Sequence, residues 1–380
     1  MRLETLAIHA GRAVDPSTGA VSLPLHTSTT FERAADGSFP TGFQYSREAN
    51  PNRIAIETCI AALEGGRQAI AFASGMAAIA ATIEAHATTD QARIIVPGDM
   101  YFGIRALVAE TDFGRRFDFV TVDMTDLEQV RRVLAEAKTT LVWVETPSNP
   151  LITVVDIQAV SELAHSAGAS VAVDNTCATP ILQKPLSLGA DIVVHSATKY
   201  IGGHSDVMLG LVVLSDTCDL GGRIRVIQKH KGGVPSPFDC WMALRGVQTL
   251  PLRMSAHCSN AATVAQALVA LPGVEGVFYP GLSDDPGHEI AGRQMSGFGG
   301  MLSFVVSGGA EEALRFSGAL KLITRATSLG GTHSLIEHRA SIEGPGTRAP
   351  AGLLRLSVGL EHPDDIIEDL RAALTATFHG

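Results

Sequence analysis

The amino-acid sequence predicts an α/β fold with a mostly parallel sheet flanked by helices. Between residues 55 and 215, short runs of β-branched residues alternate with longer stretches of helical periodicity. This alternation is typical of a parallel sheet covered by helices on both faces. The chain has 380 residues, 46% of them hydrophobic and 18% charged. That composition excludes disorder, and the length suits roughly two to three domains.

Seven short apolar runs, each ended by Gly, Pro, Asp or Ser, are the expected strands of this sheet. They span residues 69–73, 93–96, 117–122, 141–145, 170–173, 191–195 and 211–214. Helices are expected between them. Leu127, Val130 and Leu134 lie at helical spacing after the third run, and the same spacing recurs from residue 157. Each helix therefore has one apolar face to pack on the sheet.

The segments before and after this alternation have different patterns. Residues 1–52 are polar, contain four prolines and show no sustained period, so we expect an extended N-terminal arm. A long helix is expected over 239–271, broken near Pro251, then strands over 300–306 and 353–358 and a final amphipathic helix from Pro363. The sequence thus predicts an arm (1–52), an α/β domain (53–240) and a smaller C-terminal α+β domain (241–380).

Charge and hydropathy exclude several kinds of partner. The chain has 29 Lys and Arg against 39 Asp and Glu, a formal charge of −10, so we expect no nucleic-acid or anionic-lipid partner. No run of eighteen apolar residues occurs, and the first residues show no secretory-signal pattern. We therefore expect no membrane span and a cytoplasmic location.

The cysteines and histidines do not form recognisable structural or metal motifs. The cysteines are odd in number, widely spaced and without a CxxC pair, which argues against a disulfide framework and a zinc site. We expect ordinary thiols, with a catalytic thiol as the alternative. No metal site is expected at His204, His333 and His338, because they lack i, i+4 spacing and partner carboxylates. The cysteines are Cys59, Cys177, Cys218, Cys240 and Cys258.

A lysine follows a predicted buried strand in the segment DIVVHSATKYIGGHSDVMLG, residues 191–210. Lysine is rarely buried without a function, and the carboxyl edge of an open α/β sheet is where such folds bind ligands. Asp174 follows the preceding strand, 25 residues before Lys199. A lysine that forms a Schiff base and an aspartate that keeps a ring nitrogen protonated suit pyridoxal 5'-phosphate (PLP). Taken singly, a lysine in such a segment is most often a solvated loop residue, and an Asp-Asn pair after a strand, as at Asp174, is a common opening of a turn.

The segment AFASGMAAIAATI, residues 71–83, supplies a candidate phosphate site. It predicts a strand, a turn at Ser74 and Gly75, and a helix that begins near Met76. Free backbone N–H groups and the positive end of the helix dipole would then face an anion. A plain connection between a strand and a helix is the alternative interpretation.

Seven segments together carry a family resemblance. They are YSREANPN (45–52), FASGMAAI (72–79), ETPSNPL (145–151), VDNTCATP (173–180), HSATKYIGGHSD (195–206), PSPFDCWMALRGVQTL (235–250) and SLGGTHSLIEHRAS (328–341). In order and spacing they resemble the cysteine and methionine metabolism family of fold type I PLP enzymes. This family includes cystathionine γ-synthase, γ-lyase and β-lyase and methionine γ-lyase. The resemblance runs through nearly the whole chain.

The resemblance implies how the cofactor is held. Lys199 would form the Schiff base with PLP, and Asp174 would bind the pyridine nitrogen. Tyr45 and Arg47 reach in from a neighbouring subunit in this family, which implies a homo-oligomer, a tetramer built from dimers with shared active sites. The other matching residues around the ring and phosphate are Gly75, Met76, Tyr101, Thr176, Ser196 and Thr198.

The resemblance also implies the residues that meet an amino-acid substrate. Arg355 would bind the α-carboxylate by a bidentate contact, with Asn149 and Ser328 alongside. Lys199, displaced by the substrate amine, would act as the base at Cα. Tyr101 would stack on the ring and pass a proton to the leaving group.

We therefore expect a lyase that eliminates a γ- or β-substituent from a sulfur-containing or related L-amino acid. γ-Elimination would give 2-oxobutyrate and ammonia, and β-elimination would give pyruvate. Residues that mark the subtypes are mixed here: Gln44 and Thr327 stand where γ-lyases tend to carry acids, Gly103 where methionine γ-lyases carry cysteine, and His333 where an acid is frequent. The alternatives are a γ-replacement transferase that uses an acylated homoserine and a thiol, and a PLP-binding regulatory protein with little turnover.

Overall fold

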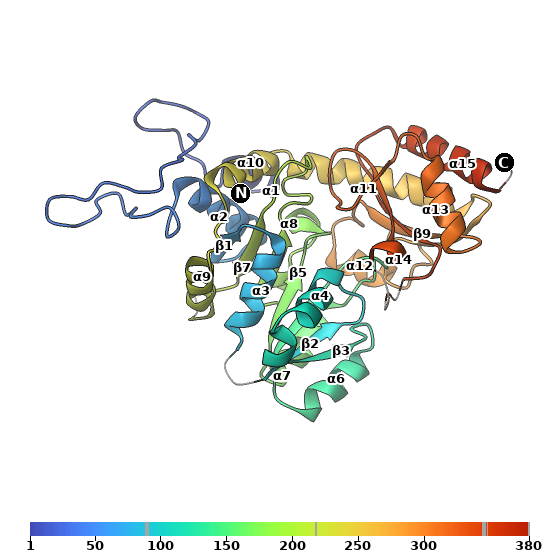
Figure 1. The fold of residues 1–380 in the computed structure, drawn as a ribbon, viewed down its shortest axis with the longest axis horizontal. Helices are drawn as coiled ribbons and strands as arrows, with labels where there is room; N and C mark the ends of the chain where they lie inside the picture. The colour runs from blue at the N-terminus through green and yellow to red at the C-terminus, as the bar shows by residue number, and fades with distance from the viewer. Residues whose placement is uncertain (88–90, 217–218, 344–346, 348, 379–380) are drawn as a thin grey trace.

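Two β-sheets organise the chain in the computed structural model, which describes residues 1–87, 91–216, 219–343, 347 and 349–378 (Figure 1). The larger sheet has seven strands in the order β1-β7-β6-β5-β4-β2-β3, and the smaller has five in the order β10-β11-β12-β9-β8. Helices cover the larger sheet, and the predicted α/β class is confirmed. No helix among the described residues is long and apolar enough to cross a membrane.

All seven predicted strands of the larger sheet are present. They are β1 (Gln68–Phe72), β2 (Ala92–Pro97), β3 (Phe117–Val122), β4 (Thr139–Glu145), β5 (Ser170–Asp174), β6 (Ile192–Ser196) and β7 (Gly210–Leu214). The pairings β2–β3, β2–β4, β4–β5 and β5–β6 are parallel, whereas β7 runs antiparallel to β1 and β6. The connection from β6 to β7 contains no helix, so it reverses the chain without a crossover.

Alternate strand residues pack on the two faces of this sheet. Ile70, Trp143 and Ala172 lie in an apolar cluster with α3 (Gly75–Ala85) and α9 (Asp219–Lys231). The opposite face packs on the other helices, as Val142 and Val171 show. These helices are α2 (Pro51–Glu64), α6 (Leu127–Glu136), α7 (Ile157–Ser166) and α10 (Pro237–Val247). Shorter segments of this region are α4 (Phe102–Glu110), α5 (Phe113–Arg116), α8 (Thr179–Leu182) and η1 (Pro185–Leu188).

The smaller sheet forms a second core with the C-terminal helices. Its strands are β8 (Val274–Phe278), β9 (Met301–Val306), β10 (Thr324–Arg325), β11 (Leu335–His338) and β12 (Leu353–Ser357). Leu302, Phe304 and Leu356 pack there against α11 (Leu250–Val269), α13 (Ala310–Ala319) and α15 (Pro363–Phe378). The remaining helices are α12 (His288–Gln294) and α14 (Arg339–Glu343). The predicted boundaries at residues 52 and 240 stay predictions.

The N-terminal segment differs in part from the expected extended arm. Helix α1 (Leu3–His9) begins the chain, and its buried Ala7 belongs to the core beside α2. Between α1 and α2 no helix is present, and in Figure 1 this dark-blue stretch projects from the body as two long loops. The prediction of an arm therefore missed one short helix.

Candidate active site

A cavity of about 340 Å³ lies at the carboxyl edge of the larger sheet. Asp174 ends β5, and Lys199 follows β6, so the parallel strands bring both side chains to the same edge, as predicted. Eleven of the thirteen predicted site residues line this cavity. They are Gly75, Met76, Tyr101, Asn149, Asp174, Thr176, Ser196, Thr198, Lys199, Ser328 and Arg355.

The Lys199 amine loses its proton at a lower pH than an ordinary lysine does. Its Nζ donates a hydrogen bond to Ser328 Oγ at 2.8 Å. Burial lowers the pKa of Lys199 to about 8, and the positive charge of Arg355 acts in the same direction. A lysine held in this way is a stronger candidate base and nucleophile than an exposed one.

Asp174 is a buried carboxyl group at the end of β5. Its Oδ1 accepts a hydrogen bond from the Thr176 backbone N–H at 3.0 Å. Burial nevertheless raises the pKa of Asp174. No ion pair to Asp174 occurs within the part of the chain that the structure describes. A protonated ring nitrogen would supply the missing positive partner, which is the chemistry that PLP offers.

The N-terminus of α3 has space for an anion because residue 75 is a glycine. Ser74 caps this helix, with its Oγ accepting from the Ala77 N–H at 3.1 Å. A Cβ on Gly75 would lie 2.9 Å from Ser196 Cβ and 3.0 Å from its Oγ. The free N–H groups of the first helical turn and the Ser196 hydroxyl thus meet without an intervening side chain. This donor set fits a phosphate group.

Arg355 lies on β12, across the cavity from the larger sheet. Its Nη1 donates to Asn149 Oδ1 at 3.0 Å, and its Nη2 donates to the Ser328 carbonyl at 2.7 Å. Nη2 also lies 2.8 Å from Glu337 Oε2. The side chain is buried, yet its Nε has no hydrogen-bond partner among the described atoms. That unused donor is available to a substrate carboxylate.

Sequence reasoning missed Glu145 as a part of this site. Its carboxylate accepts hydrogen bonds from the backbone N–H groups of Tyr101, at 2.7 Å, and Asn149, at 3.0 Å. Burial and the neighbouring Asp174 raise the pKa of Glu145 well above its ordinary value. The residue stands at a strand end inside ETPSNPL, directly comparable with Asp174. That position is the signal that could have identified it.

Tyr45 and Arg47 do not line the cavity of their own chain. They lie in the projecting segment between α1 and α2, where Tyr45 is exposed and the Arg47 guanidinium lies 5.4 Å from its ring centroid. The structure therefore brings together the two sheets' residues but not these two side chains.

Cys177 lines the cavity, but its environment does not favour a thiolate. Burial raises the pKa of this thiol, as do the nearby carboxyl groups Glu145 and Asp174. The described cysteines are all free, and Cys218 lies outside the described residues. Within the described ranges no three His, Cys, Asp or Glu side chains gather as a metal site. His204 and His333 are exposed, and His338 is buried.

The fold and the cavity define a class of protein. A half-buried lysine and a buried aspartate at the carboxyl edge of a mostly parallel sheet, beside a helix N-terminus, are typical of PLP-dependent enzymes of fold type I. The family model for Cys/Met metabolism PLP-dependent enzymes matches residues 4–375. The chain belongs to this family and is a PLP-dependent enzyme.

Relatives with three different reaction names are similar to nearly the whole chain. Cystathionine gamma-synthase of Mycobacterium leprae is 45% identical over 98% of this chain and 96% of its own length. Cystathionine beta-lyase of Coxiella burnetii is 43% identical, over 98% and 97%. The solved structure of cystathionine gamma-lyase from Lactobacillus plantarum, complexed with L-serine, superposes with a TM-score of 0.93 at 40% identity, covering 99% of both chains.

Proposed function

We propose that this enzyme is a lyase that eliminates a γ- or β-substituent from a sulfur-containing or related L-amino acid, giving a 2-oxo acid and ammonia. The observation that carries the proposal is the joint position of Lys199 and Arg355. Lys199 Nζ contacts the Ser328 hydroxyl, and Arg355 contacts the Ser328 carbonyl. An amino acid whose carboxylate binds Arg355 would therefore present its Cα beside the Lys199 amine.

Each side chain then has a defined task. Arg355 and Asn149 bind and orient the carboxylate, and Lys199 takes the Cα proton with an amine whose pKa lies near 8. Burial raises the pKa of Tyr101, so its phenol stays protonated and can donate to a departing thiolate. PLP, when bound, supplies the electron sink that stabilises negative charge at Cα.

We propose that PLP is held by side chains of the larger sheet and its connections. Lys199 is the covalent attachment point, and Asp174 binds the ring nitrogen. The phosphate is bound at the α3 N-terminus, and Tyr101 stacks on the ring. The residues that contribute there are Gly75, Met76, Thr176, Ser196 and Thr198, with Tyr45 and Arg47 of a neighbouring subunit.

A second candidate is a γ-replacement transferase that uses an acylated homoserine and a thiol. It is favoured by the 45% identity to the Mycobacterium leprae cystathionine gamma-synthase. The contacts of Lys199, Tyr101 and Arg355 serve both reactions equally. The two candidates differ in whether a second nucleophile is required.

A substrate panel separates the two. The holoenzyme is incubated with cystathionine, methionine, homocysteine, canavanine, or acylated homoserine plus cysteine, and assayed for 2-oxobutyrate, pyruvate, ammonia and new thioethers. The proposal predicts a 2-oxo acid without any added thiol. Lys199→Ala should lower turnover by about 10³-fold, whereas Lys184→Ala, outside the cavity lining, should not. Thioether formation with no 2-oxo acid would instead identify the transferase, and no product from any substrate would contradict both.

We further propose that the enzyme is a homotetramer built from dimers that share active sites. The proposal is supported by the exposed Tyr45 and Arg47 on a segment that projects from the body (Figure 1). Arg47→Ala and Lys199→Ala, each inactive alone, should regain activity when their subunits are exchanged, because one mixed site then carries both native residues. No recovery after exchange verified by mass spectrometry would refute shared sites.

We also propose a cytoplasmic location. It is supported by the described cysteines, which are all unpaired, because free thiols are typical of reducing compartments. Fractionation of cells that express the untagged protein tests this proposal, and recovery in the secreted fraction would contradict it.

A further inference from the structure

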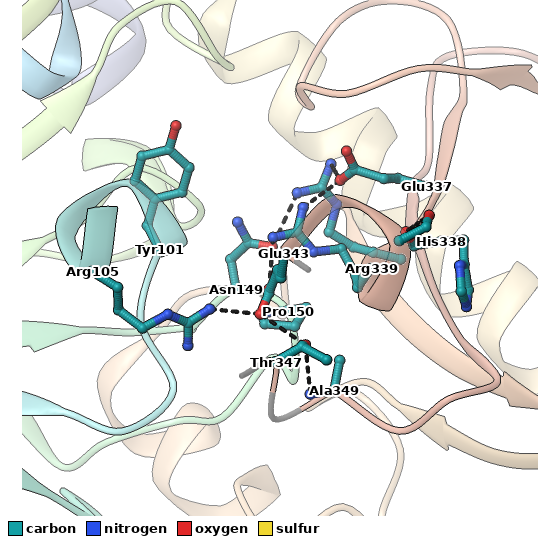
Figure 2. A network of polar contacts seen from close by, with 12 residues as sticks. Tyr101, Arg105, Asn149, Pro150, Glu337, His338, Arg339, Glu343, Thr347 and Ala349 are labelled. Atoms are coloured by element: carbon teal, nitrogen blue, oxygen red, sulfur yellow. Dashed lines mark hydrogen bonds and ion pairs between the residues drawn. The ribbon is translucent and has the colours of Figure 1, made fainter. Parts of the chain in front are cut away.

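Five charged side chains form a continuous chain of ion pairs beside the active-site cavity, and three of them, Glu337, Arg339 and Arg355, line it. Arg355 lies 2.8 Å from Glu337, which lies 2.5 Å from Arg339. Arg339 in turn lies 2.8 Å from Glu343, which lies 2.6 Å from Arg105. Figure 2 shows the members from Arg105 to Glu337 with their contacts. We refer to these five residues as the ion-pair chain.

The ion-pair chain connects the two walls of the cavity. Arg355 lies on β12 and Glu337 on the adjacent β11, where the two residues are register partners. Arg339 and Glu343 begin and end α14. Arg105 lies on α4, the helix that begins directly after Tyr101. The contacts therefore run from the strand that carries the proposed carboxylate site to the helix beside the proposed proton donor.

The middle of the ion-pair chain is removed from water. The side chains of Arg339 and Glu343 are 2% and 1% exposed, and those of Glu337 and Arg355 are each 4% exposed. Burying charges costs free energy even when they are paired, so such a chain is poorly explained by stability alone. A positional requirement at the cavity offers a better explanation.

The ion-pair chain carries a net positive charge that one bound anion would neutralise. Three guanidinium groups face two carboxylates, an excess of one positive charge. Arg355 Nε is buried without a partner among the described atoms. A substrate α-carboxylate at this position would balance the excess.

The surroundings of Glu343 favour the ionised form of its carboxylate. Burial acts to raise its pKa, but the hydrogen bond and charge of Arg339, the hydroxyl of Thr347 and the charge of Arg105 outweigh it, and the pKa lies below its ordinary value. Glu343 is also the one contact through which α14 reaches Arg105 in the ion-pair chain. Its removal would break the connection without touching Arg355 or Tyr101.

We propose that Arg339 and Glu343 are positioning residues for substrate binding, which hold Arg355 and Tyr101 at a fixed separation across the cavity. The inference rests on the proposed roles of Arg355 and Tyr101 as carboxylate site and proton donor. Arg339 acts through Glu337, which it shares with Arg355, and Glu343 acts through Arg105. Neither residue needs to touch the reacting atoms.

Glu343→Gln tests the proposal, with Glu84→Gln as the matched control. Glu84 is likewise a buried carboxylate between two cations, Arg116 and Lys231, but it lies outside the cavity lining. Four quantities are measured on the holoenzymes. They are KM and kcat on the best substrate of the panel, the Kd of L-norvaline from the cofactor absorbance, and hydrogen–deuterium exchange over residues 102–110 and 335–343.

Glu343→Gln should raise KM and the norvaline Kd about tenfold or more. It should lower kcat by a smaller factor than the factor by which KM rises, and it should speed hydrogen–deuterium exchange in both segments. Glu343→Asp, which keeps the charge on a shorter side chain, should restore part of the affinity and stands in if the amide variant does not fold. Glu84→Gln should match the parent. Parental KM and exchange in Glu343→Gln, or equal losses in Glu84→Gln, would overturn the inference. If the parent turns over no panel substrate, the proposed function fails, while the norvaline and exchange results still decide the inference.

Discussion

The proton affinity of Lys199 makes a quantitative prediction about covalent capture of PLP by the apoprotein. Only the neutral form of the Lys199 amine reacts with the PLP aldehyde. With a pKa of about 8, caused first by burial and then by the charge of Arg355, about 9% of the amine is neutral at pH 7 and about 91% at pH 9. The capture rate should therefore rise about tenfold between pH 7 and pH 9 and change little above that. An exposed lysine, with a pKa near 10.4, would give a rise of about 100-fold over the same interval with no plateau.

Stopped-flow absorbance after mixing apoprotein with excess PLP measures this rate at constant ionic strength. The reaction of Nα-acetyl-lysine in the same buffers, expressed per neutral amine, corrects for titration of PLP itself. Lys199→Ala should remove the phase and so assign it to this residue. A corrected rate that still climbs tenfold per pH unit above pH 9 would refute the inference that burial and Arg355 depress the pKa of Lys199.

Two further predictions concern packing and pH-dependent stability. Gly75→Ala places a methyl group 2.9 Å from Ser196 Cβ, and an overpacking cost of about 1–3 kcal/mol should weaken PLP binding at least fivefold in an absorbance titration. Gly292→Ala, whose Cβ meets nothing within 4 Å, should bind PLP as the parent does. Burial lowers the pKa of His257 to about 4, so between pH 6.5 and 4 the unfolded chain binds a proton that the folded chain does not. The free energy of unfolding should thus fall by about 2 kcal/mol from pH 7 to pH 5 through this residue, and His257→Gln should lose that part of the pH dependence in denaturant titrations.

The larger sheet was predictable because each of its strands is a continuous apolar run bounded by turn residues. The break between the helices of the C-terminal half was placed less well. It was expected near Pro251, but α10 ends at Val247 and α11 begins at Leu250, with Pro251 in its first turn. Proline is favoured there because the backbone N–H groups of the first helical turn have no partner within the helix, so a residue without an N–H loses no hydrogen bond. Helix α1 was missed because its seven residues are too few to show a period.

The site was predictable where a residue's position in the chain determines its place on the sheet. Asp174 and Lys199 follow neighbouring parallel strands, so their shared cavity follows from topology alone. Arg355 lies on the second sheet, and no local pattern indicates that β12 faces β5 and β6. Glu337 and Arg339 have charged side chains that resemble solvated residues in a sequence, and only the structure shows that they are buried.

The residues proposed to bind the cofactor and those proposed to bind the substrate belong to different parts of the fold. Cofactor binding and substrate binding should therefore respond to different mutations. The proposed ring and phosphate contacts of the same chain come from Gly75 to Lys199, on or beside the larger sheet. The proposed carboxylate site combines Asn149 of that region with Ser328 and Arg355 beside the smaller sheet. Changes that alter how the two sheets meet should therefore weaken substrate binding while PLP remains bound. A change confined to the α3 N-terminus should do the reverse, so the cofactor's affinity and the substrate's KM are independent measures of the two supports.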